Sequence, residues 1–463
     1  MKIYNEPREI ALERVENGDV TACVVGAGTI GLPLATFLAN KNFSVACYDK
    51  SSERVKQING GQVVFEYHEE LKRALEREKI SASTDPAVMR SAELIFVCVP
   101  TPLTHDKAMD ISILFDVGEN IGRNISAGSM VIFESSVAIG TTAQVRAKIE
   151  QISGLKCGVD FGVAYCPERY NPGLPKEIHP EIRYSEGDSF HEQHRFDQIG
   201  RVVGGADKKS LDLAKAVYST IIKAKIKTVS SIEAAEATKL LENIFRDVNI
   251  ALVNELAKVF SEFNLDTFEV IEAAKSKPFA FLPHYPGCGV GGECIPVDTH
   301  YLIKQAEDMG IETSLMNAAR SVNDSMPQYT VSLLERALKK KGRGIQGSNI
   351  NILGAAYKKN INDTRLSPAF VIAQMLQDMG ANVKICDPLV HESRLNGHES
   401  VSLPDIFDRA DAIILATDHD VFKSLDFSKS GSMRTKTIID GRNFFVRDAL
   451  EKNGFTYRCV GKS

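Results

Sequence analysis

One stretch near the amino terminus restricts the possible fold more than any other. Residues 20–25 are apolar and run directly into a turn at 26–31 with the pattern Gly-x-Gly-x-x-Gly. An apolar helical run at 32–40 follows, and then a second apolar segment at 44–48 that ends on an aspartate. A strand, a glycine-rich turn, a helix and a second strand are the first unit of a doubly wound parallel sheet.

The residues of this turn also indicate its ligand. Gly26 and Gly28 allow a tight turn and the close approach of a pyrophosphate, and Gly31 allows the helix to pack against the strand. Asp49 stands about 21 residues beyond Gly28, where a carboxylate accepts from a ribose 2′-hydroxyl and repels a 2′-phosphate. We therefore predict NAD as the cofactor. Lys50 is the nearby residue that could weaken the preference for NAD over NADP.

The alternation of strand and helix continues. Three more apolar strands are expected at 94–99, 130–133 and 161–165. Ligands bind at the carboxyl ends of such strands, so Thr101 and Ser136 are candidate contacts, although each hydroxyl could equally serve as a helix cap or turn residue.

Residues 173–200 interrupt this pattern. They are rich in Pro, Glu, His and Gly and are expected to form a solvated excursion. His191 and His194 lie one residue closer together than the His-x3-His spacing of the helical zinc motif, so we predict no metal site there.

A long helix is predicted from Ser231 to Asn264. Lys239 and Asn243 lie four residues apart on one stripe of it, which favours a partly buried pair, although a polar stripe is more often a solvated face. A helix of this length also offers a two-fold interface, so we expect a homodimer.

Residues 283–302 contain four glycines and two cysteines and are the strongest candidate for chemistry. A thiol on a glycine-rich loop is accessible and can be tuned by backbone amides, which makes Cys294 the candidate nucleophile. Cys288 is better explained as a small buried apolar residue. A zinc cage of these cysteines with His284 and His300 would lack the usual Cys-x2-Cys pairing, and we predict no metal.

A second α/β unit is expected after Pro327 and a polar linker at 339–344. Its predicted elements are a helix at 368–379 and strands at 349–353, 383–386, 412–416 and 437–439. Because it lacks the Gly-x-Gly-x-x-Gly pattern, it should hold a different anionic ligand. Lys358, Arg365 and Arg442 follow strand ends and are the cations available for a diphosphate.

The chain as a whole fits an α/β protein with two Rossmann-like doubly wound domains joined by a long central helix. With 463 residues it should form three domains, at 1–205, 206–330 and 331–463. A net charge of −5 argues against a nucleic-acid or membrane partner. Nine cysteines without Cys-x2-Cys pairs, and no apolar signal or anchor segment, predict a cytoplasmic protein.

Six motifs stand in order along the chain: Gly-Ala-Gly-Thr-Ile-Gly-Leu-Pro-Leu-Ala at 26–35, Val-Pro-Thr-Pro at 99–102, Pro-Glu-Arg at 167–169, Lys-Leu-Leu-Glu-Asn at 239–243, Gly-Gly-Glu-Cys-Ile-Pro-Val-Asp at 291–298, and Asp-Gly-Arg at 440–442. Together they make the chain resemble the UDP-glucose/GDP-mannose dehydrogenase family along nearly its whole length. The resemblance implies an NAD-dependent, four-electron oxidation of a nucleotide sugar at C6, from alcohol to carboxylate.

The resemblance also implies roles for individual residues. Cys294 would attack the C6 aldehyde and carry the thioester, while Lys239 and Asn243 would hold the oxyanion and the water. Asp298 would act as a base through water, and Glu168 would help thioester hydrolysis. The implied cofactor-binding residues are Gly26, Gly28, Ile30, Gly31, Asp49, Arg54, Thr101, Ser136 and Arg365. The implied substrate-binding residues are Glu168, Lys239, Asn243, His284, Tyr285, Gly287, Gly291, Lys358 and Arg442.

The sugar is harder to predict. Residues 277–281 resemble family members that oxidise UDP-N-acetylglucosamine, and residues 245–249 those that oxidise UDP-N-acetylmannosamine, so we favour the first and place the second next. Glu293 stands where a histidine is frequent, and a carboxylate close to a thiol raises the thiol pKa. The alternatives are a UDP-glucose 6-dehydrogenase, a catalytically silent nucleotide-sugar-binding protein, and a two-electron hydroxyacid dehydrogenase. The NADH yield per substrate, two or one, separates a four-electron from a two-electron enzyme.

Overall fold

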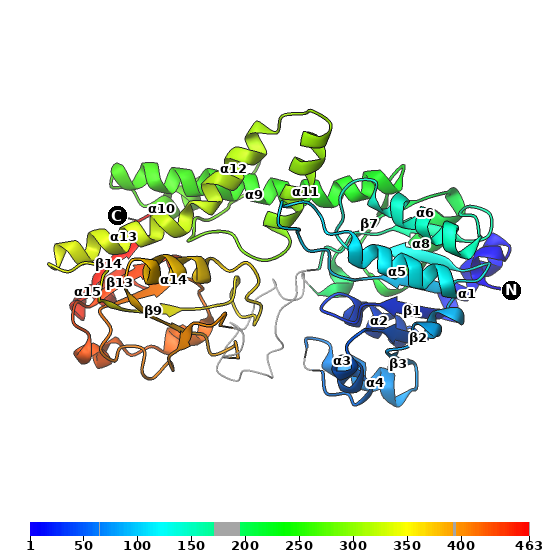
Figure 1. Cartoon of the computed structure of the whole chain (residues 1–463), viewed down its shortest axis with the longest axis horizontal. Helices are drawn as coiled ribbons and strands as arrows, with labels where there is room; N and C mark the ends of the chain where they lie inside the picture. Colours follow the sequence, from blue (N-terminus) through cyan, green and yellow to red (C-terminus); the bar gives the residue numbers. More distant parts are fainter. Residues whose placement is uncertain (64, 171–194, 392–394, 463) are drawn as a thin grey trace. The chain divides into compact units, whose positions relative to one another are not determined.

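The computed structural model describes residues 1–63, 65–170, 195–391 and 395–462. They form two compact units, of which the first holds the described residues up to Glu242 together with His300–Gln305, and the second holds the rest. Each unit has its own sheet (Figure 1). Most of the excursion predicted at 173–200, including His191 and His194, lies outside the described residues.

Within the described residues, the first unit contains an eight-stranded sheet in the order β3-β2-β1-β4-β5-β6-β7-β8. Its strands are β1 (Thr21–Val25), β2 (Ser44–Tyr48), β3 (Ile80–Ser83), β4 (Leu94–Val97), β5 (Met130–Phe133), β6 (Gly162–Tyr165), β7 (Arg201–Gly205) and β8 (Ile226–Thr228). Neighbouring strands are parallel except β6 and β7. The sheet therefore continues past residue 205, where we expected the first domain to end, and the three-domain division stays a prediction.

Helices cover both faces of this sheet. The helices of the first unit are α1 (Arg8–Asn17), α2 (Gly31–Asn40), α3 (Ser52–Asn59), α4 (His68–Glu76), α5 (Ser112–Asn124), α6 (Thr141–Ser153) and α8 (Lys208–Ile221). α5 and α6 lie side by side over one face, whereas α2 packs with α4 and α8 over the other (Figure 1). Alternate strand residues divide between the two cores, with Phe96 and Ile132 in one and Ile95 and Val131 in the other.

The second unit contains, in its described part, a six-stranded parallel sheet in the order β11-β10-β9-β12-β13-β14. Its strands are β9 (Asn349–Leu353), β10 (Asn382–Cys386), β11 (Glu399–Ser400), β12 (Ala412–Leu415), β13 (Thr437–Asp440) and β14 (Thr456–Cys459). The helices packed with it include α13 (Met326–Lys340), α14 (Pro368–Asp378) and α15 (Arg447–Lys452). Because α13 runs through Lys340, the start of the linker that we expected at 339–344 is helical instead.

The long helix predicted from Ser231 to Asn264 is α9 (Ile232–Glu262), which begins in the first unit and ends in the second. Three shorter helices follow it along the chain: α10 (Thr267–Lys275), α11 (Ile295–Asp308) and α12 (Ser314–Asp324). Two Rossmann-like units joined by a long helix confirm the predicted fold class.

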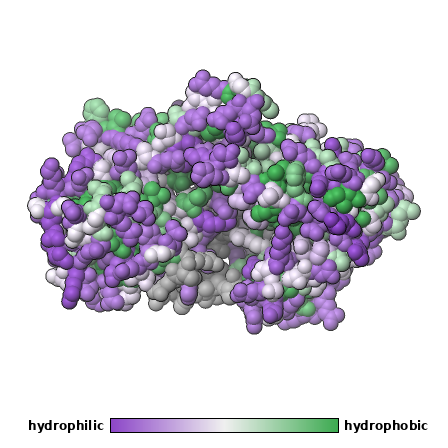
Figure 2. Space-filling model, viewed as in Figure 1, coloured by the Kyte–Doolittle hydropathy of each residue, from purple (hydrophilic) through white to green (hydrophobic). Residues whose placement is uncertain are grey.

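The helices of the described residues can be compared with the length and hydropathy that a membrane span requires. In the described ranges, no helix combines the length and the apolar character needed to cross a bilayer. Figure 2 shows a face that is largely hydrophilic, with hydrophobic side chains in small groups.

Candidate active site

The glycine-rich turn of the first unit has the shape that a pyrophosphate requires. Gly26 has a φ of +89°, and a Cβ there would lie 2.8 Å from the carbonyl oxygen of Cys98. A Cβ on Gly31 would lie 1.9 Å from the Gly26 oxygen, whereas a Cβ on Gly28 would meet no described atom within 4 Å. Ile30 precedes α2 and provides no side-chain cap, so the helix N-terminus is available to an anion. These residues fit the diphosphate of a dinucleotide.

Asp49 is held at this turn by the backbone. Its carboxylate accepts from the Ala27 amide at 3.0 Å and from the Ser51 amide at 2.9 Å, and the residue stays partly exposed. Arg54 donates from Nε to the Ala27 oxygen at 2.8 Å. Lys50 instead forms an exposed ion pair with Asp116 at 3.4 Å. The carboxylate is therefore fixed beside the glycine-rich turn, and its contact with the ribose stays a prediction.

The two hydroxyl residues at the strand ends lie together. Thr101 Oγ1 donates to the carbonyl oxygen of Ser136 at 2.7 Å. The Tyr301 hydroxyl of α11 donates to the carbonyl oxygen of Thr101. The carboxyl ends of β4 and β5 thus meet as the topology requires.

Glu168 and Lys239 also come together in the first unit. Lys239 Nζ donates to the backbone carbonyl oxygen of Glu168 at 2.6 Å, and both residues are buried. The Glu168 carboxylate accepts from the Tyr170 amide and from Arg201 Nη1, the latter at 3.2 Å. It is the carbonyl of Glu168, and not its carboxylate, that contacts the lysine.

In the second unit, the cysteine loop leads directly into α11. Gly292 has a φ of +83°, and a Cβ there would lie 2.8 Å from the Tyr357 ring. A Cβ on Gly291 would lie 2.6 Å from the carbonyl oxygen of Leu366. These contacts explain the paired glycines, which let the loop lie flat against the segment after β9. Cys294 is exposed and immediately precedes the first residue of α11.

Asn243 and Asp298 are joined by a direct hydrogen bond. Asn243 Nδ2 donates to Asp298 Oδ2 at 2.6 Å, and both side chains are buried. The Asp298 amide donates to the Cys294 oxygen at 3.0 Å within the first turn of α11. The turn that starts at Cys294 is therefore fixed to α9 through Asp298.

Glu293 is paired with Arg365. The guanidinium of Arg365 bonds the Glu293 carboxylate and also holds Asp363, with Nη2 at 2.5 Å. The hydrogen bond to Asp363 raises the pKa of Arg365 above its ordinary value. The Gly292 amide donates to the Arg365 oxygen at 3.0 Å. Two carboxylates thus share the guanidinium of Arg365, which offsets only part of the negative charge that Glu293 places next to Cys294.

Gly287, Cys288 and Arg442 form a second contact between the loop and the sheet. A Cβ on Gly287 would lie 2.5 Å from Arg442 Nη1, and Arg442 Nε donates to the Ala416 oxygen at 3.1 Å. Cys288 is buried beside the same oxygen, and burial raises its thiol pKa. Lys358 is partly buried in the segment after β9.

His284 and Tyr285 pack against the helices of the second unit. His284 lies edge-on to Phe245 of α9, with ring centroids 5.9 Å apart. Tyr285 stacks on Phe268 of α10, and its hydroxyl donates to Glu272. Their assignment to the substrate stays a prediction.

Known proteins match the chain over almost its whole length. The UDP-glucose/GDP-mannose dehydrogenase family matches by its NAD binding domain at residues 20–222, its central domain at 233–325 and its UDP binding domain at 351–447. A UDP-N-acetyl-D-mannosamine dehydrogenase of Pyrococcus horikoshii is 36% identical over 444 residues, covering 95% of this chain and 98% of that protein. The chain belongs to the UDP-glucose/GDP-mannose dehydrogenase family. It is an NAD-dependent nucleotide-sugar dehydrogenase.

Two further likenesses place this dehydrogenase among its relatives. A solved structure of a UDP-D-ManNAc dehydrogenase from Pyrococcus horikoshii has a TM-score of 0.84 and 34% identity, covering 96% of this chain and 99% of that one. A UDP-N-acetyl-D-glucosamine 6-dehydrogenase of Salmonella typhi is 33% identical over 411 residues, covering 88% of this chain and 92% of that protein.

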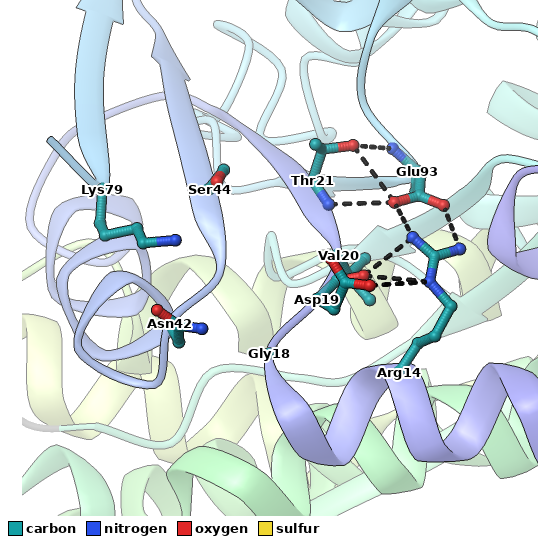
Figure 3. Close-up of a pocket in the computed structure, with 9 residues that line it drawn as sticks. All are labelled: Arg14, Gly18, Asp19, Val20, Thr21, Asn42, Ser44, Lys79 and Glu93. Carbon is teal, nitrogen blue, oxygen red and sulfur yellow. Dashed lines mark hydrogen bonds and ion pairs between the residues drawn. The ribbon is translucent and has the colours of Figure 1, made fainter.

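At the amino ends of the strands, the dehydrogenase has a shallow pocket built on an ion pair (Figure 3). Arg14 donates through both Nη atoms to the Glu93 carboxylate, each at 2.9 Å, and the Thr21 amide donates to the same carboxylate at 3.1 Å. This pair ties α1 to the starts of β1 and β4. Ligands of a doubly wound sheet bind at the other ends, so the role of this cluster is structural.

Some residues at the strand ends escaped the sequence analysis. Glu134 follows β5, and its position beside Ser136 was the one available signal. Tyr301 and Gln305 project from α11, and Gln305 bonds the amide and the carbonyl of Ile139 at 3.0 and 2.8 Å. In the part of the chain that the structure describes, no group of three or more His, Cys, Asp or Glu residues could hold a metal ion.

Proposed function

We propose that this dehydrogenase oxidises the C6 hydroxymethyl group of a UDP-N-acetylhexosamine to a carboxylate through a thioester on Cys294. The net reaction consumes two NAD and one water and yields two NADH. Bound at the glycine-rich turn, NAD supplies the hydride acceptor for both oxidations.

The accessibility of Cys294 carries this proposal. All nine cysteines lie in the described part of the chain, and Cys294 alone is exposed. It stands where α11 begins, and a helix N-terminus favours a negatively charged thiolate. A thiolate adds to the C6 aldehyde to give a hemithioacetal, whose oxidation gives the thioester that water then cleaves.

We propose that four other side chains supply the remaining functions. Lys239 and Asn243 lie one turn apart on α9 and donate to the oxyanion that develops at C6. Asp298, held by Asn243, takes the proton of the attacking water. We propose that Glu168 supports the hydrolysis step by holding Lys239 with its carbonyl oxygen. Thr101, Ser136 and Arg365 are proposed to contact the cofactor, and Lys358 and Arg442 the diphosphate of UDP.

Replacing the nucleophile tests the mechanism. Cys294→Ser should stop net turnover, because an alkoxide is harder to form than a thiolate and an ester is released more slowly. The variant should still bind NAD, and incubation with substrate and NAD should add the mass of the acyl group to the peptide containing residue 294. Cys288→Ser is the matched control, since that buried thiol donates to the Ala416 oxygen, as a serine hydroxyl also can, and the variant should retain most activity. Full turnover in both variants would exclude the thioester.

The sugar is proposed from the relatives. The sequence motifs favoured UDP-N-acetylglucosamine, whereas the relatives named above include proteins named for mannosamine as well as for glucosamine. Because the mannosamine protein has the higher identity of the two curated relatives and covers more of both chains, we now place UDP-N-acetylmannosamine first. NADH absorbance with equal concentrations of the two amino sugars and UDP-glucose decides the order. A yield of one NADH per sugar would contradict the four-electron reaction.

A homodimer through α9 is a separate proposal. Five apolar side chains that are 44% or more exposed lie in one series: Leu241, Phe245, Leu252 and Val259 along this helix, and Phe263 directly after its end. Their spacings of four and seven residues keep them on one side, and such a stripe is characteristic of a helix-to-helix interface. Leu252→Glu combined with Val259→Glu should give monomers in analytical ultracentrifugation. Val371→Glu, at an exposed apolar site on α14, should leave the mass unchanged.

A further inference from the structure

Four polar side chains meet in the interior of the first unit, next to the loop that contacts Lys239. They are Glu134 at the end of β5, Glu168 after β6, Arg201 at the start of β7 and Tyr218 in α8. Glu134 and Arg201 are 1% exposed, Tyr218 is fully buried, and Glu168 is 7% exposed. Two carboxyl groups therefore share an interior that contains one guanidinium.

The charges in this interior require a proton. The Glu168 amide donates to the Glu134 carbonyl oxygen at 3.4 Å, so the two residues lie side by side. Glu134 Oε2 and Glu168 Oε2 are both buried and accept no hydrogen bond from a described group. One guanidinium balances one carboxylate, and an uncompensated second negative charge in this interior would be very costly.

The donors identify which carboxyl group is ionised. Arg201 Nη1 donates to Glu168 Oε1 at 3.2 Å, and the Tyr170 amide donates to the same oxygen, so the negative charge belongs on Glu168. Glu134 Oε1 accepts from the Tyr218 hydroxyl at 2.5 Å, and its other oxygen is buried without a described donor. The proton therefore belongs on Glu134.

The remaining titratable groups around Glu134 agree with this assignment. Cys98 and Cys166 face it, and burial raises the pKa of both thiols well above the ordinary value, so neither contributes a charge. Burial raises the pKa of Tyr218 as well. Burial first, and then the Glu168 charge, raise the pKa of Glu134 to about 8, against the opposing effect of Arg201.

We propose that Glu134 is a positioning residue that holds a proton shared with Glu168 and thereby fixes the Glu168 carbonyl against Lys239. This inference deepens the proposed function, since it depends on the role of Lys239 there. The Glu168 oxygen that accepts from Lys239 Nζ at 2.6 Å belongs to the residue whose side chain Glu134 and Arg201 anchor. Ionisation of Glu134 would place two carboxylates against each other and loosen this loop.

Turnover as a function of pH tests the positioning role. Glu134→Gln is permanently neutral, donates to Glu168 through its amide and accepts from Tyr218, so it should retain activity near pH 7. In the wild type, kcat should fall about tenfold relative to this variant between about pH 7 and pH 9, as a group with a pKa near 8 ionises. Glu134→Ala, which loses both hydrogen bonds, should have a reduced kcat at every pH.

Thermal unfolding tests the proton itself. A carboxyl group whose pKa is raised by folding binds a proton that the unfolded chain releases, so its stabilising contribution is complete below the ordinary value of about 4.3 and is lost as pH rises to 8. The Tm of Glu134→Gln should therefore increase relative to wild type by at least about 3 °C between about pH 5 and pH 8. The matched control is Glu93→Gln, which breaks the ion pair with Arg14 in the same unit and should lower Tm equally at both pH values.

The outcomes separate this inference from the mechanism. If the Tm difference between Glu134→Gln and the wild type does not change with pH, the proposal that Glu134 holds a proton is overturned, whatever the activity of Cys294→Ser. If the Tm difference increases with pH but kcat depends on pH in the same way in the wild type and in Glu134→Gln, only the positioning role is overturned. If Glu134→Gln does not fold, the infrared band of a neutral carboxyl group in the wild type must disappear between about pH 7 and pH 9, and its absence at pH 7 would equally refute the proposal.

Discussion

The two α/β units share one backbone arrangement but bind different ligands. In the first unit, Gly26 follows β1 with a φ of +89°, and the Ala27 amide donates to Asp49, which follows β2. In the second unit, Gly354 follows β9 with a φ of +90°, and the Ala355 amide donates at 2.7 Å to Asp387, which follows β10. Both units thus have a strand, a glycine, a second strand and an aspartate in the same order.

The two aspartates differ in what surrounds them. Asp49 receives two backbone amides and stays partly exposed. Asp387 is buried and receives the Ala355, Ala356 and Leu389 amides together with His419 Nε2, the last at 3.0 Å. Burial acts to raise the pKa of Asp387, but the hydrogen bonds, led by that from His419, outweigh it and lower the pKa.

One histidine distinguishes Asp387 from Asp49. His419 Nε2 lies 3.0 Å from the Asp387 carboxylate, and its Nδ1 accepts from the Asn360 amide at 2.9 Å. No residue of the first unit that the structure describes donates a side-chain hydrogen bond to Asp49 in this way. In the second unit the aspartate is therefore part of the folded interior, and we propose that Lys358 and Arg442 recognise the ligand instead.

The largest effect is expected when this histidine is removed. His419→Ala should lower the free energy of unfolding by about 3 kcal/mol, because it leaves a cavity and takes a partner from a buried carboxylate. Denaturant titration measures the loss, and NAD affinity should not change. His398→Ala, in the same unit but partly exposed, should cost much less. Equal losses in the two variants would contradict the structural role of Asp387.

Removing the cations of the second unit should affect the other ligand. Lys358→Ala and Arg442→Ala should each weaken UDP binding by about 1.5–3 kcal/mol, the value of a charge-assisted hydrogen bond. Calorimetry with UDP alone measures this without turnover. NAD affinity should stay at the wild-type value, and unchanged UDP affinity in both variants would move the nucleotide site elsewhere.

The aspartate of the first unit should matter for ligand binding and little for stability. Asp49→Ala should raise the KM for NAD about tenfold, roughly 1.4 kcal/mol, while the pyrophosphate contacts remain. Its Tm should stay close to that of the wild type, in contrast to His419→Ala. A wild-type enzyme equally fast with NADP would show that Asp49 does not face the ribose.

Most of the sheet strands could be predicted from the sequence, because the signals for a strand are local. β2, β5 and β9 have the predicted bounds, since β2 and β5 are largely apolar, asparagine alternates with isoleucine in β9, and a glycine or a polar residue follows each strand. The short strands β3, β8 and β11 were not predicted, because segments such as Glu399–Ser400 have neither apolar character nor alternation. These segments are strands only because each pairs with a neighbouring strand of the sheet.

The site was partly predictable for the same reason. Asn243 and Asp298, whose side chains are hydrogen-bonded, were both predicted as site residues from motifs that are each contiguous in sequence. The proton-sharing cluster was not predictable, because Glu134 and Tyr218 are 84 residues apart and neither lies in a recognisable pattern. The pairing of His419 with Asp387 depends likewise on tertiary packing over 32 residues of sequence.

Acid titration gives the smallest expected effect and sharpens the contrast between the aspartates. Because folding lowers the pKa of Asp387, its stabilising contribution is present above the ordinary value of about 3.9 and is lost as pH falls through the lower folded value. Asp387→Asn cannot titrate. The stability of the wild type over this variant should therefore shrink, by about 1 kcal/mol or less, as pH falls from about 5 to below 3.9. Urea titrations at several pH values measure the gap, and a gap that widens in acid would mean that the ionised form of Asp387 is not the one that the second unit stabilises.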